Sequence, residues 1–470
     1  MLINKIGLVS VLSAVVLFGY VNRGIAAEMD EILETFPQLG SELPHSVLRA
    51  DLKDAKTQLP LEIRNGGYGS AMTAHPTQAN QFYALTDRGP NANHQGDYGK
   101  GKSFPVADFT PRIGLFEVKT NGKIVQLKDI LLKRPDGSLI SGLPNSSALG
   151  GTGETPYHAD GNPVLVNDEL PYSVTSNPIK LDDYGLDGEG LVALKDGTFW
   201  VSDEYGPHIV HFDHNGIEMT RINAFKDDSR ALLHLPAVFQ HRRANRGMEG
   251  LAITPDESTL VGIMQSTMKN PNKAAQKGDL TRIVSINLNN GATEQYLYRQ
   301  QKNENANSEI AALTANKFLV IERDGSFLFG GPKNANPNAQ KQVYRIDLRS
   351  GTALSKVALS STIMHDESRG LLIDGLTLEQ YAQEKGWDAL AEKGIKPVTK
   401  KLIIDMVNEV GYAHDKMEGL WVIDDQHLGI LNDDDFATWS TDGKLEQKYL
   451  DKNTIDSNRL FIIKKNLLSD

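Results

Sequence analysis

Cysteine is absent from the 470-residue sequence. Its absence excludes disulfide bonds, thiolate nucleophiles, cysteine-ligated zinc and iron–sulfur clusters. The fold must therefore be held by side-chain packing, with or without a bound metal ion. For an exported protein, a chain without cysteine is compatible with the Gram-negative periplasm.

Basic charge is also scarce, with 49 Lys and Arg residues against 60 Asp and Glu residues and a formal net charge of −11. This balance argues against a nucleic-acid-binding surface and against attachment to an anionic membrane surface. We expect neither nucleic acid nor membrane as a partner, whereas a small anionic ligand can still bind locally. The sequence leaves the oligomeric state open.

Long apolar runs are rare, and the one at residues 6–20 follows Lys5 and precedes the small residues 24–27. A basic start, a short apolar segment and small residues are typical of a secretory signal peptide. An uncleaved membrane anchor is the alternative, although the run is short for a bilayer span. We predict a signal peptide at residues 1–27 and a periplasmic or secreted single domain at residues 28–470, with no stable membrane span.

A glutamate–glycine cassette recurs along the chain, at residues 187–191, 246–251 and 416–420, with a degenerate copy at residues 308–313. In the degenerate copy Glu309 is expected to take the glutamate position. Each copy leads through an apolar stretch, a turn and a second apolar stretch that ends in polar or acidic residues, as in a β-hairpin. A third apolar strand follows each hairpin, and in places a fourth.

Repeated units that each bury one sheet face against their neighbours predict an all-β fold, a β-propeller. Five units are legible and the unequal spacing leaves room for a sixth, so we expect five or six four-stranded blades. The N-terminal strand at residues 46–52 is expected to complete the last blade and close the ring. Residues 133–183 form an inserted loop by composition, and residues 376–393 have helical spacing.

The acids of the units are expected to meet at one rim, because the start of a hairpin's first strand lies beside the end of its second. Crowded carboxylates repel one another unless a cation compensates, and hard oxygen ligands suit Ca²⁺. The alternative is that these acids only shape turns and contacts between blades. We predict Ca²⁺ as the cofactor, with Glu189, Glu249, Glu418, Asp87 and Asp433 as ligands.

Basic and amide side chains next to these acids are candidates for substrate binding. Arg88, Arg246 and Arg323 have the planar guanidinium group that suits an anionic ester, and Asn91 lies close to Arg88 in the sequence. The arginines could instead only neutralise the acids. Asp203 and Glu204 end the second strand of their hairpin and are the candidates for a catalytic base.

Residues 96–103 match the phosphate-loop pattern letter for letter. The phosphate loop works only between a strand and a helix, and the flanking residues here show no helical pattern. We interpret the segment as a mobile cationic loop carrying Lys100 and Lys102. Neither a serine-hydrolase elbow nor a zinc-protease helix motif is present.

Together these motifs resemble the bacterial family described as "esterase-like activity of phytase", a phytase-like domain. The resemblance spans roughly residues 66–436 and rests on residues 86–91, 188–191, 200–207, 245–251, 322–324 and 432–436. It implies an exported β-propeller protein linked to the hydrolysis of phosphate esters or other esters.

The combined evidence predicts an exported, Ca²⁺-assisted ester hydrolase that acts on a small anionic substrate, with phosphate monoesters such as phytate as the leading class. A lactonase or carboxylesterase is the first alternative, because other propellers open lactones with one axial metal and a carboxylate. The second is a non-catalytic envelope scaffold whose acids hold structural calcium.

Overall fold

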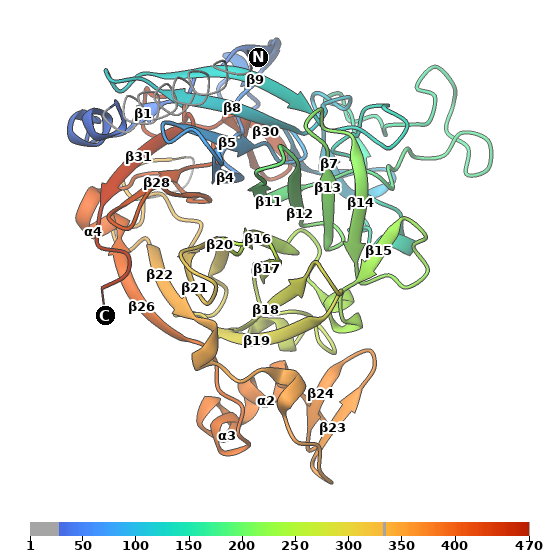
Figure 1. The fold of residues 1–470 in the computed structure, drawn as a ribbon. Coiled ribbons are helices and arrows are strands. Elements are labelled where there is room, and N and C mark those ends of the chain that lie inside the picture. The colour runs from blue at the N-terminus through green and yellow to red at the C-terminus, as the bar shows by residue number, and fades with distance from the viewer. Residues whose placement is uncertain (1–27, 332–334, 470) are drawn as a thin grey trace, which may run out of the picture.

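The computed structural model describes residues 28–331 and 335–469 (Figure 1). The predicted signal peptide lies outside the described residues. The fold is mostly β, with 41% strand and 11% helix, and most sheets are antiparallel. Within the described part of the chain, no helix combines the length and the apolar character needed to cross a membrane.

Five sheets of four or five strands account for most of the fold, and they coincide with the five repeat units of the sequence. The first contains β4 (Ala71–Ala74), β5 (Gln81–Leu85), β8 (Arg112–Val118) and β9 (Ile124–Leu131). The second contains β11 (Gly188–Ala193), β12 (Phe199–Asp203), β13 (His208–Phe212), β14 (Glu218–Asn223) and β15 (Ala231–His234), the last pairing parallel to β14.

The other three of these sheets are antiparallel throughout. The third contains β16 (Met248–Ile253), β17 (Thr259–Met264), β18 (Leu280–Asn287) and β19 (Thr293–Arg299), and the fourth contains β20 (Ala306–Ala312), β21 (Lys317–Arg323), β22 (Lys341–Asp347) and β26 (Thr399–Asp405). The fifth contains β27 (Gly419–Val422), β28 (His427–Leu431), β31 (Arg459–Lys464) and β1 (Ser41–Glu42).

The first strands of these five sheets contact one another in a closed cycle, β4–β11–β16–β20–β27–β4. Side chains from all five line one apolar cavity of about 190 Å³. In Figure 1 β4, β11, β16 and β20 lie toward the middle of the molecule, and the outer strands β9, β14, β19 and β26 lie toward its edge. The sheets are therefore arranged around a common axis.

The strand that completes the fifth sheet is not the one predicted. Residues 47–53 form β2 (Val47–Lys53), which pairs with β3 (Pro60–Arg64) in a separate hairpin. The short β1 instead pairs with β31, through Ser41↔Leu460 and Glu42↔Arg459. A two-residue strand shows no period-2 pattern, which is why the longer apolar segment was the more visible candidate.

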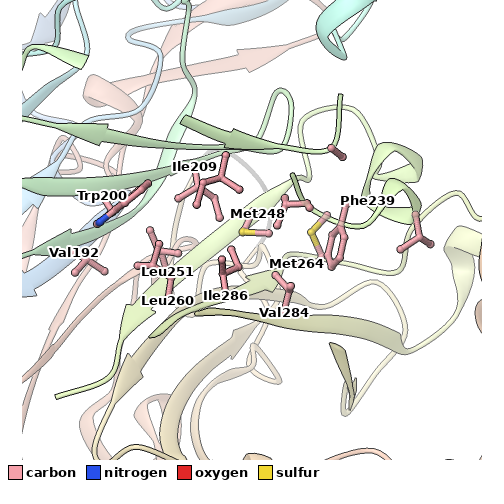
Figure 2. Close-up of a cluster of buried hydrophobic side chains, with 14 of the residues drawn as sticks. Val192, Trp200, Ile209, Phe239, Met248, Leu251, Leu260, Met264, Val284 and Ile286 are labelled. Carbon is pink, nitrogen blue, oxygen red and sulfur yellow. The ribbon is translucent and has the colours of Figure 1, made fainter. Parts of the chain in front are cut away.

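Neighbouring sheets bury their faces against each other. Figure 2 shows the cluster between the second and third sheets, where Val192, Trp200 and Ile209 lie near Leu251 and Leu260. Trp200 is 5% exposed and the other four are at most 3% exposed. Full burial of one such aliphatic side chain stabilises a fold by about 1.5–3 kcal/mol, so these faces supply much of the stability that disulfides cannot.

The glycine of the cassette is required where adjacent first strands approach closely. A Cβ on Gly250 would lie 2.6 Å from the backbone nitrogen of Ile310, and one on Gly190 would lie 2.7 Å from that of Leu251. No real Cβ makes backbone contacts that short. The glycine of the repeated Glu-Gly-Leu sequence is therefore needed for β11 to pack on β16 and for β16 to pack on β20.

The remaining elements decorate the five sheets. Three small sheets are built from short strands. One contains β6 (Ala92–Gly96), β7 (Gly99–Ser103) and β10 (Thr155–Tyr157), and another contains β23 (Ile363–Asp366), β24 (Gly370–Ile373) and β25 (Leu376–Thr377). The third contains β29 (Thr438–Thr441) and β30 (Lys444–Gln447). Residues 28–35 are helical. Further helices are α2 (Leu378–Lys385), α3 (Trp387–Glu392) and α4 (Met406–Val410). The 3₁₀ turns are η1 (Ser147–Leu149), η2 (Ala237–His241), η3 (Ala275–Lys277), η4 (Leu348–Ser350), η5 (Leu354–Lys356) and η6 (Asp435–Ala437).

The two insertions occupy different places. The segment predicted to be helical contains α2 and α3, which project at the bottom of Figure 1, away from the central strands. It is anchored on the third sheet, where Glu379 is buried and pairs with Arg282 at 2.7 Å. Residues 133–183 are largely irregular and reach the acidic rim, because Glu154 lies 3.7 Å from Arg88.

Candidate functional site

A polar cavity of about 360 Å³ opens where the hairpin ends of several sheets meet. Its wall brings together side chains far apart in the sequence, including Asp87, Arg88, Asn91, Lys102, Glu189, Glu204, Arg323, Asp415, Lys416 and Asp435. Carboxyl groups outnumber basic groups around it. The predicted convergence of hairpin ends thus produces a single pocket.

β-Bulges direct two of the predicted acids toward this cavity. In the β11–β12 pair, Gly188 faces Asp203 and Gly190 faces Ser202, so Glu189 is the extra residue. In the β16–β17 pair, Met248 faces Met264 and Gly250 faces Ile263, so Glu249 is the extra residue. A bulge kinks the strand and re-aims the unpaired side chain, which places both glutamates at the rim.

The degenerate copy of the cassette is offset by one residue. In the β20–β21 pair, Asn307 faces Glu322 and Glu309 faces Ile321, so Ser308 occupies the bulge. Glu309 therefore takes the place that glycine has in the other copies, and its prediction as an equivalent rim glutamate is wrong. Ser308 accepts a 2.8 Å hydrogen bond from Nε of Arg323 instead.

Glu309 lies deeper, on the axis of the ring. Its Oε1 accepts hydrogen bonds from the backbone amides of Ile310 (2.9 Å) and Leu251 (3.1 Å), and the amide of Met72 also faces it. Met72 belongs to β4, which does not neighbour β20 in the cycle, so the side chain reaches across the axis. Burial raises the pKa of Glu309 well above its ordinary value.

Three carboxyl groups form the tightest acidic cluster. Oxygens of Asp87, Asp187 and Glu189 lie within 4.8 Å of one another, and all three residues are buried. Burial raises the pKa of each, and neighbouring carboxylates add to the effect. Asp187 was not predicted as a ligand from the sequence, but it lies beside the two predicted ligands Asp87 and Glu189. It comes directly before the bulged segment that carries Glu189.

A second acidic pair is bridged by an amide. Nε2 of Gln265 donates hydrogen bonds to Oε1 of Glu204 at 2.7 Å and to Oε1 of Glu249 at 2.6 Å. The other oxygen of Glu249, Oε2, is buried and has no hydrogen-bond partner. Burial and the adjacent Glu204 raise the pKa of Glu249, so the neutral form of Glu249 is favoured.

Arg323 neutralises part of this ring. Its Nη2 pairs closely with Oε1 of Glu418 and lies 3.9 Å from Oε1 of Glu249. Oε2 of Glu418 is buried without a hydrogen-bond partner. Glu418 and Glu249 thus lie in the same ring as predicted, but outside the tight cluster around Glu189.

Arg88 is held by acids on two sides. Its Nη1 lies 3.2 Å from Oδ2 of Asp187 and 3.7 Å from Glu154, and it donates a 3.1 Å hydrogen bond to Oδ1 of Asn245. The Tyr205 ring lies 5.6 Å from the guanidinium carbon. Nε of Arg88 is buried and has no partner, so one donor of this group is still available.

The segment that matches the phosphate-loop pattern is an ordered hairpin of β6 and β7 rather than a mobile loop. Strand β7 also pairs in parallel with β10, where Lys102 faces Pro156. Lys102 lines the cavity, and burial followed by the charge of Arg88 lowers its pKa to about 8. The strand pairing is a long-range contact with residues 155–157, which the local sequence does not reveal.

Asp203 has a different position from the one expected of a catalytic base. Its Oδ1 accepts the backbone amide of Asp187 at 2.8 Å and its Oδ2 accepts that of Gly206 at 2.7 Å. It is fully buried and is not part of the cavity wall, whereas Glu204 is. Asp203 therefore shapes the turn that presents Glu204.

Two further predicted residues are not part of the cavity wall. Asp433 is 1% exposed and pairs with Lys416 at 2.7 Å, so it orients a cavity-lining lysine. Arg246 is not part of the wall and bridges Arg243 across a tight turn. Asn91 does line the cavity, and its Nδ2 donates to the carbonyl of Gly89 at 3.1 Å.

The sequence matches a family model over residues 63–436. The model describes the phytase-like family, "esterase-like activity of phytase". The chain belongs to this family. The resemblance inferred from the cassette motifs is thereby confirmed, and the match includes every charged residue of the cavity wall.

A curated relative is an uncharacterized secreted protein from Arthroderma benhamiae, which is 28% identical over 256 residues. The match covers 44% of this chain and 48% of the relative, so it spans about half the length of that protein.

Similar solved structures include a member of the GH130 mannoside phosphorylase family (8% identity, 90% of this chain, 95% of that chain, TM-score 0.34). They also include a PQQ-bound aldose sugar dehydrogenase from Streptomyces coelicolor (10% identity, 88% and 86%, TM-score 0.30) and virginiamycin B lyase from Staphylococcus aureus (12% identity, 82% and 98%, TM-score 0.25). Likenesses this weak support no conclusion about function.

Proposed function

We propose that this protein is an exported, metal-assisted ester hydrolase built on a five-bladed β-propeller, with phosphate monoesters as its substrate class. The observation that carries the activity is the cavity at the hairpin ends, whose wall holds five carboxyl groups and four basic groups and which contains part of the acidic cluster. The closed cycle of five first strands supports the blade count. Export follows from the predicted signal peptide, and the secreted relative supports it.

The residues at the cavity fit a hard divalent cation. Asp87, Asp187 and Glu189 offer only oxygen donors within 4.8 Å of one another, which suits Ca²⁺. Burial and, after it, neighbouring carboxylates raise the pKa of all three groups, and a bound cation would favour their charged forms. When bound, the cation supplies Lewis-acid polarisation of the ester oxygen.

The chain's own side chains have distinct roles in this proposal. Lys102 and the free Nε of Arg88 bind the anionic oxygens of the ester and stabilise the charge that grows during the reaction. Glu204 removes a proton from the attacking water, and Gln265 fixes the position of that carboxylate. Glu249, beside it, holds a proton because burial favours its neutral form.

One observation favours a second candidate, the hydrolysis of a lactone or carboxyl ester. Arg88 and Arg323 are each paired with buried acids, so much of their charge is already compensated. A neutral ester would need the cavity's base but not a strong anion clamp.

A panel of substrates separates the two activities. Purified protein is assayed with p-nitrophenyl phosphate, p-nitrophenyl acetate and a lactone, in calcium and in chelator, with Glu204→Gln and Glu384→Gln compared. Glu384 is exposed on α2, away from the cavity, and serves as the matched control. We expect calcium-dependent phosphatase activity that Glu204→Gln lowers by about 100-fold or more and Glu384→Gln leaves unchanged. Turnover of only the carboxyl ester and the lactone would establish the second candidate. If no ester is turned over, the remaining hypothesis is a non-catalytic envelope scaffold.

A further inference from the structure

A cluster of arginines lies beside the cavity, on the turn between η2 and β16. Arg242, Arg243 and Arg246 fall within five residues of one another, and the amide of Arg246 donates to the carbonyl of Arg243 at 3.1 Å. Arg243 and Arg246 also form an antiparallel bridge. Because directly opposed residues project from the same face, these two guanidinium groups leave the turn on one side.

Each of the three arginines carries a buried nitrogen without a hydrogen-bond partner: Nη2 of Arg242, Nη1 of Arg243 and Nη1 of Arg246. Unmet donors on charged groups are unfavourable when buried. Like charges that face each other across a bridge add to this cost. A ligand with several acceptor atoms would therefore satisfy these donors and relieve the repulsion between the charges.

Lys269 extends the positive charge. Its amide donates to the carbonyl of His241 at 2.7 Å, which places Lys269 next to the turn. Burial and then the charges of Arg242 and Arg243 lower the pKa of Lys269. Among the acids, Glu304 faces Arg243 and Asp203 faces Arg242, and both oxygens of Asp203 already accept backbone amides.

We propose that this turn is a binding subsite for a second phosphate group of the substrate, distinct from the phosphate that is hydrolysed. A phosphate offers several acceptor oxygens and a double negative charge, which match a set of unmet guanidinium donors. The turn also touches the cavity, because Asn245 at its tip accepts a hydrogen bond from Arg88. The subsite rests on the proposed function and narrows its substrates to esters that carry more than one phosphate.

Binding of inorganic phosphate tests the subsite without any need for turnover. Isothermal titration of the parent protein is compared with the double variant Arg243→Gln/Arg246→Gln, which keeps donors but removes both charges. We expect the parent to bind one phosphate more than the variant, or to bind it at least tenfold more tightly. Arg349→Gln, at an exposed arginine on η4, removes one charge elsewhere and should behave like the parent.

Thermal unfolding separates a ligand site from a structural role. In phosphate-free buffer of low ionic strength, the double variant should melt at the same temperature as the parent or higher, because the repulsion between the two arginines is gone. Added phosphate should then raise the melting temperature of the parent more than that of the variant. A variant that is less stable in both buffers, or equal phosphate binding by both proteins, would overturn the proposal.

The substrate range provides the second measurement. The ratio of kcat/KM for a sugar bisphosphate to that for p-nitrophenyl phosphate should fall at least tenfold in the double variant. An unchanged ratio in an active enzyme would reject the subsite. An enzyme with no phosphatase activity that still shows the difference in phosphate binding would retain the subsite and reject the phosphatase.

Discussion

At the scale of single residues, Gln265 holds together Glu204, which lines the cavity, and Glu249, which is not part of the cavity wall. Its one amide nitrogen binds both Glu204 and Glu249, and its own backbone carbonyl accepts hydrogen bonds from Asn307 and Gln300. A side chain held in this way loses little freedom when the substrate arrives. The position of Glu204 relative to bound water thus depends on a residue that does not itself react.

Replacing Gln265 by leucine should therefore damage turnover rather than binding. Gln265→Leu keeps the volume but removes the donor that both carboxyl groups share, so we expect kcat to fall about 10- to 100-fold while KM changes little. Steady-state kinetics on the best ester substrate measures the split. Gln126→Leu on the outer strand β9 removes a hydrogen-bonded glutamine far from the cavity and should leave both constants unchanged. Equal effects from the two variants would contradict the positioning role.

Glu309 should govern stability and its dependence on pH. Its folded-state pKa is raised above the ordinary 4.5, so the folded protein holds a proton that the unfolded chain releases. The stability contributed by this group is present below pH 4.5 and is lost as the pH rises toward the folded pKa. Glu418 is the charged neighbour that adds to the effect.

Urea unfolding of Glu309→Gln and Glu309→Ala between pH 5 and 8 measures this contribution. The glutamine variant should flatten the decline in the free energy of unfolding with pH, because its amide does not titrate. The alanine variant should lose about 1–3 kcal/mol, since the backbone amides of Ile310 and Leu251 lose their acceptor. An identical pH profile in the parent and the glutamine variant would contradict the assignment.

At the scale of elements, the cassette glycines set the distance between first strands. Gly250→Ala would bring a Cβ to 2.6 Å from the nitrogen of Ile310 and 2.8 Å from the carbonyl carbon of Glu309. Neither backbone atom can move without disturbing the ring. Differential scanning calorimetry should show a destabilisation of about 1–3 kcal/mol. Gly278→Ala, whose new Cβ would lie 3.6 Å from its nearest neighbour, should unfold like the parent.

The hairpins were predictable because their signals are local. Apolar stretches bounded by glycine-containing turns marked strands such as β12, β18 and β22, and the acids at the hairpin ends could be assigned to one rim. The register was not predictable, because a bulge depends on the partner strand. This is why Ser308, and not Glu309, proved equivalent to Glu189. Lys102 was misjudged for the same reason, since its strand is fixed by β10 about fifty residues later.

At the scale of the whole molecule, the hairpin ends of four of the five sheets contribute residues to one cavity. The protein carries a net charge of −11, and part of that excess is concentrated where charges are hardest to bury. Protonation and ion pairs with Arg88 and Arg323 offset some of it. A divalent cation would offset the rest and would bind the folded state alone, because the unfolded chain does not assemble its ligands.

Calcium should therefore stabilise the entire fold by mass action. At a calcium concentration one hundred times Kd, the expected gain is about 2.7 kcal/mol. That gain raises the melting temperature by about 2–5 °C in a chain of this size, and a chelator should reverse it.

Glu189→Gln is the most informative variant. Within residues 28–331 and 335–469 the carboxylate of Glu189 makes no hydrogen bond that the change would break. It should abolish the calcium response while leaving the melting temperature in chelator equal or higher, since one repelling charge is removed. Glu384→Gln should respond to calcium like the parent. A Glu189→Gln protein that keeps the full response would place the cation elsewhere, and a parent protein that does not respond would leave Arg88, Arg323 and Lys416 as the ring's main counter-charges.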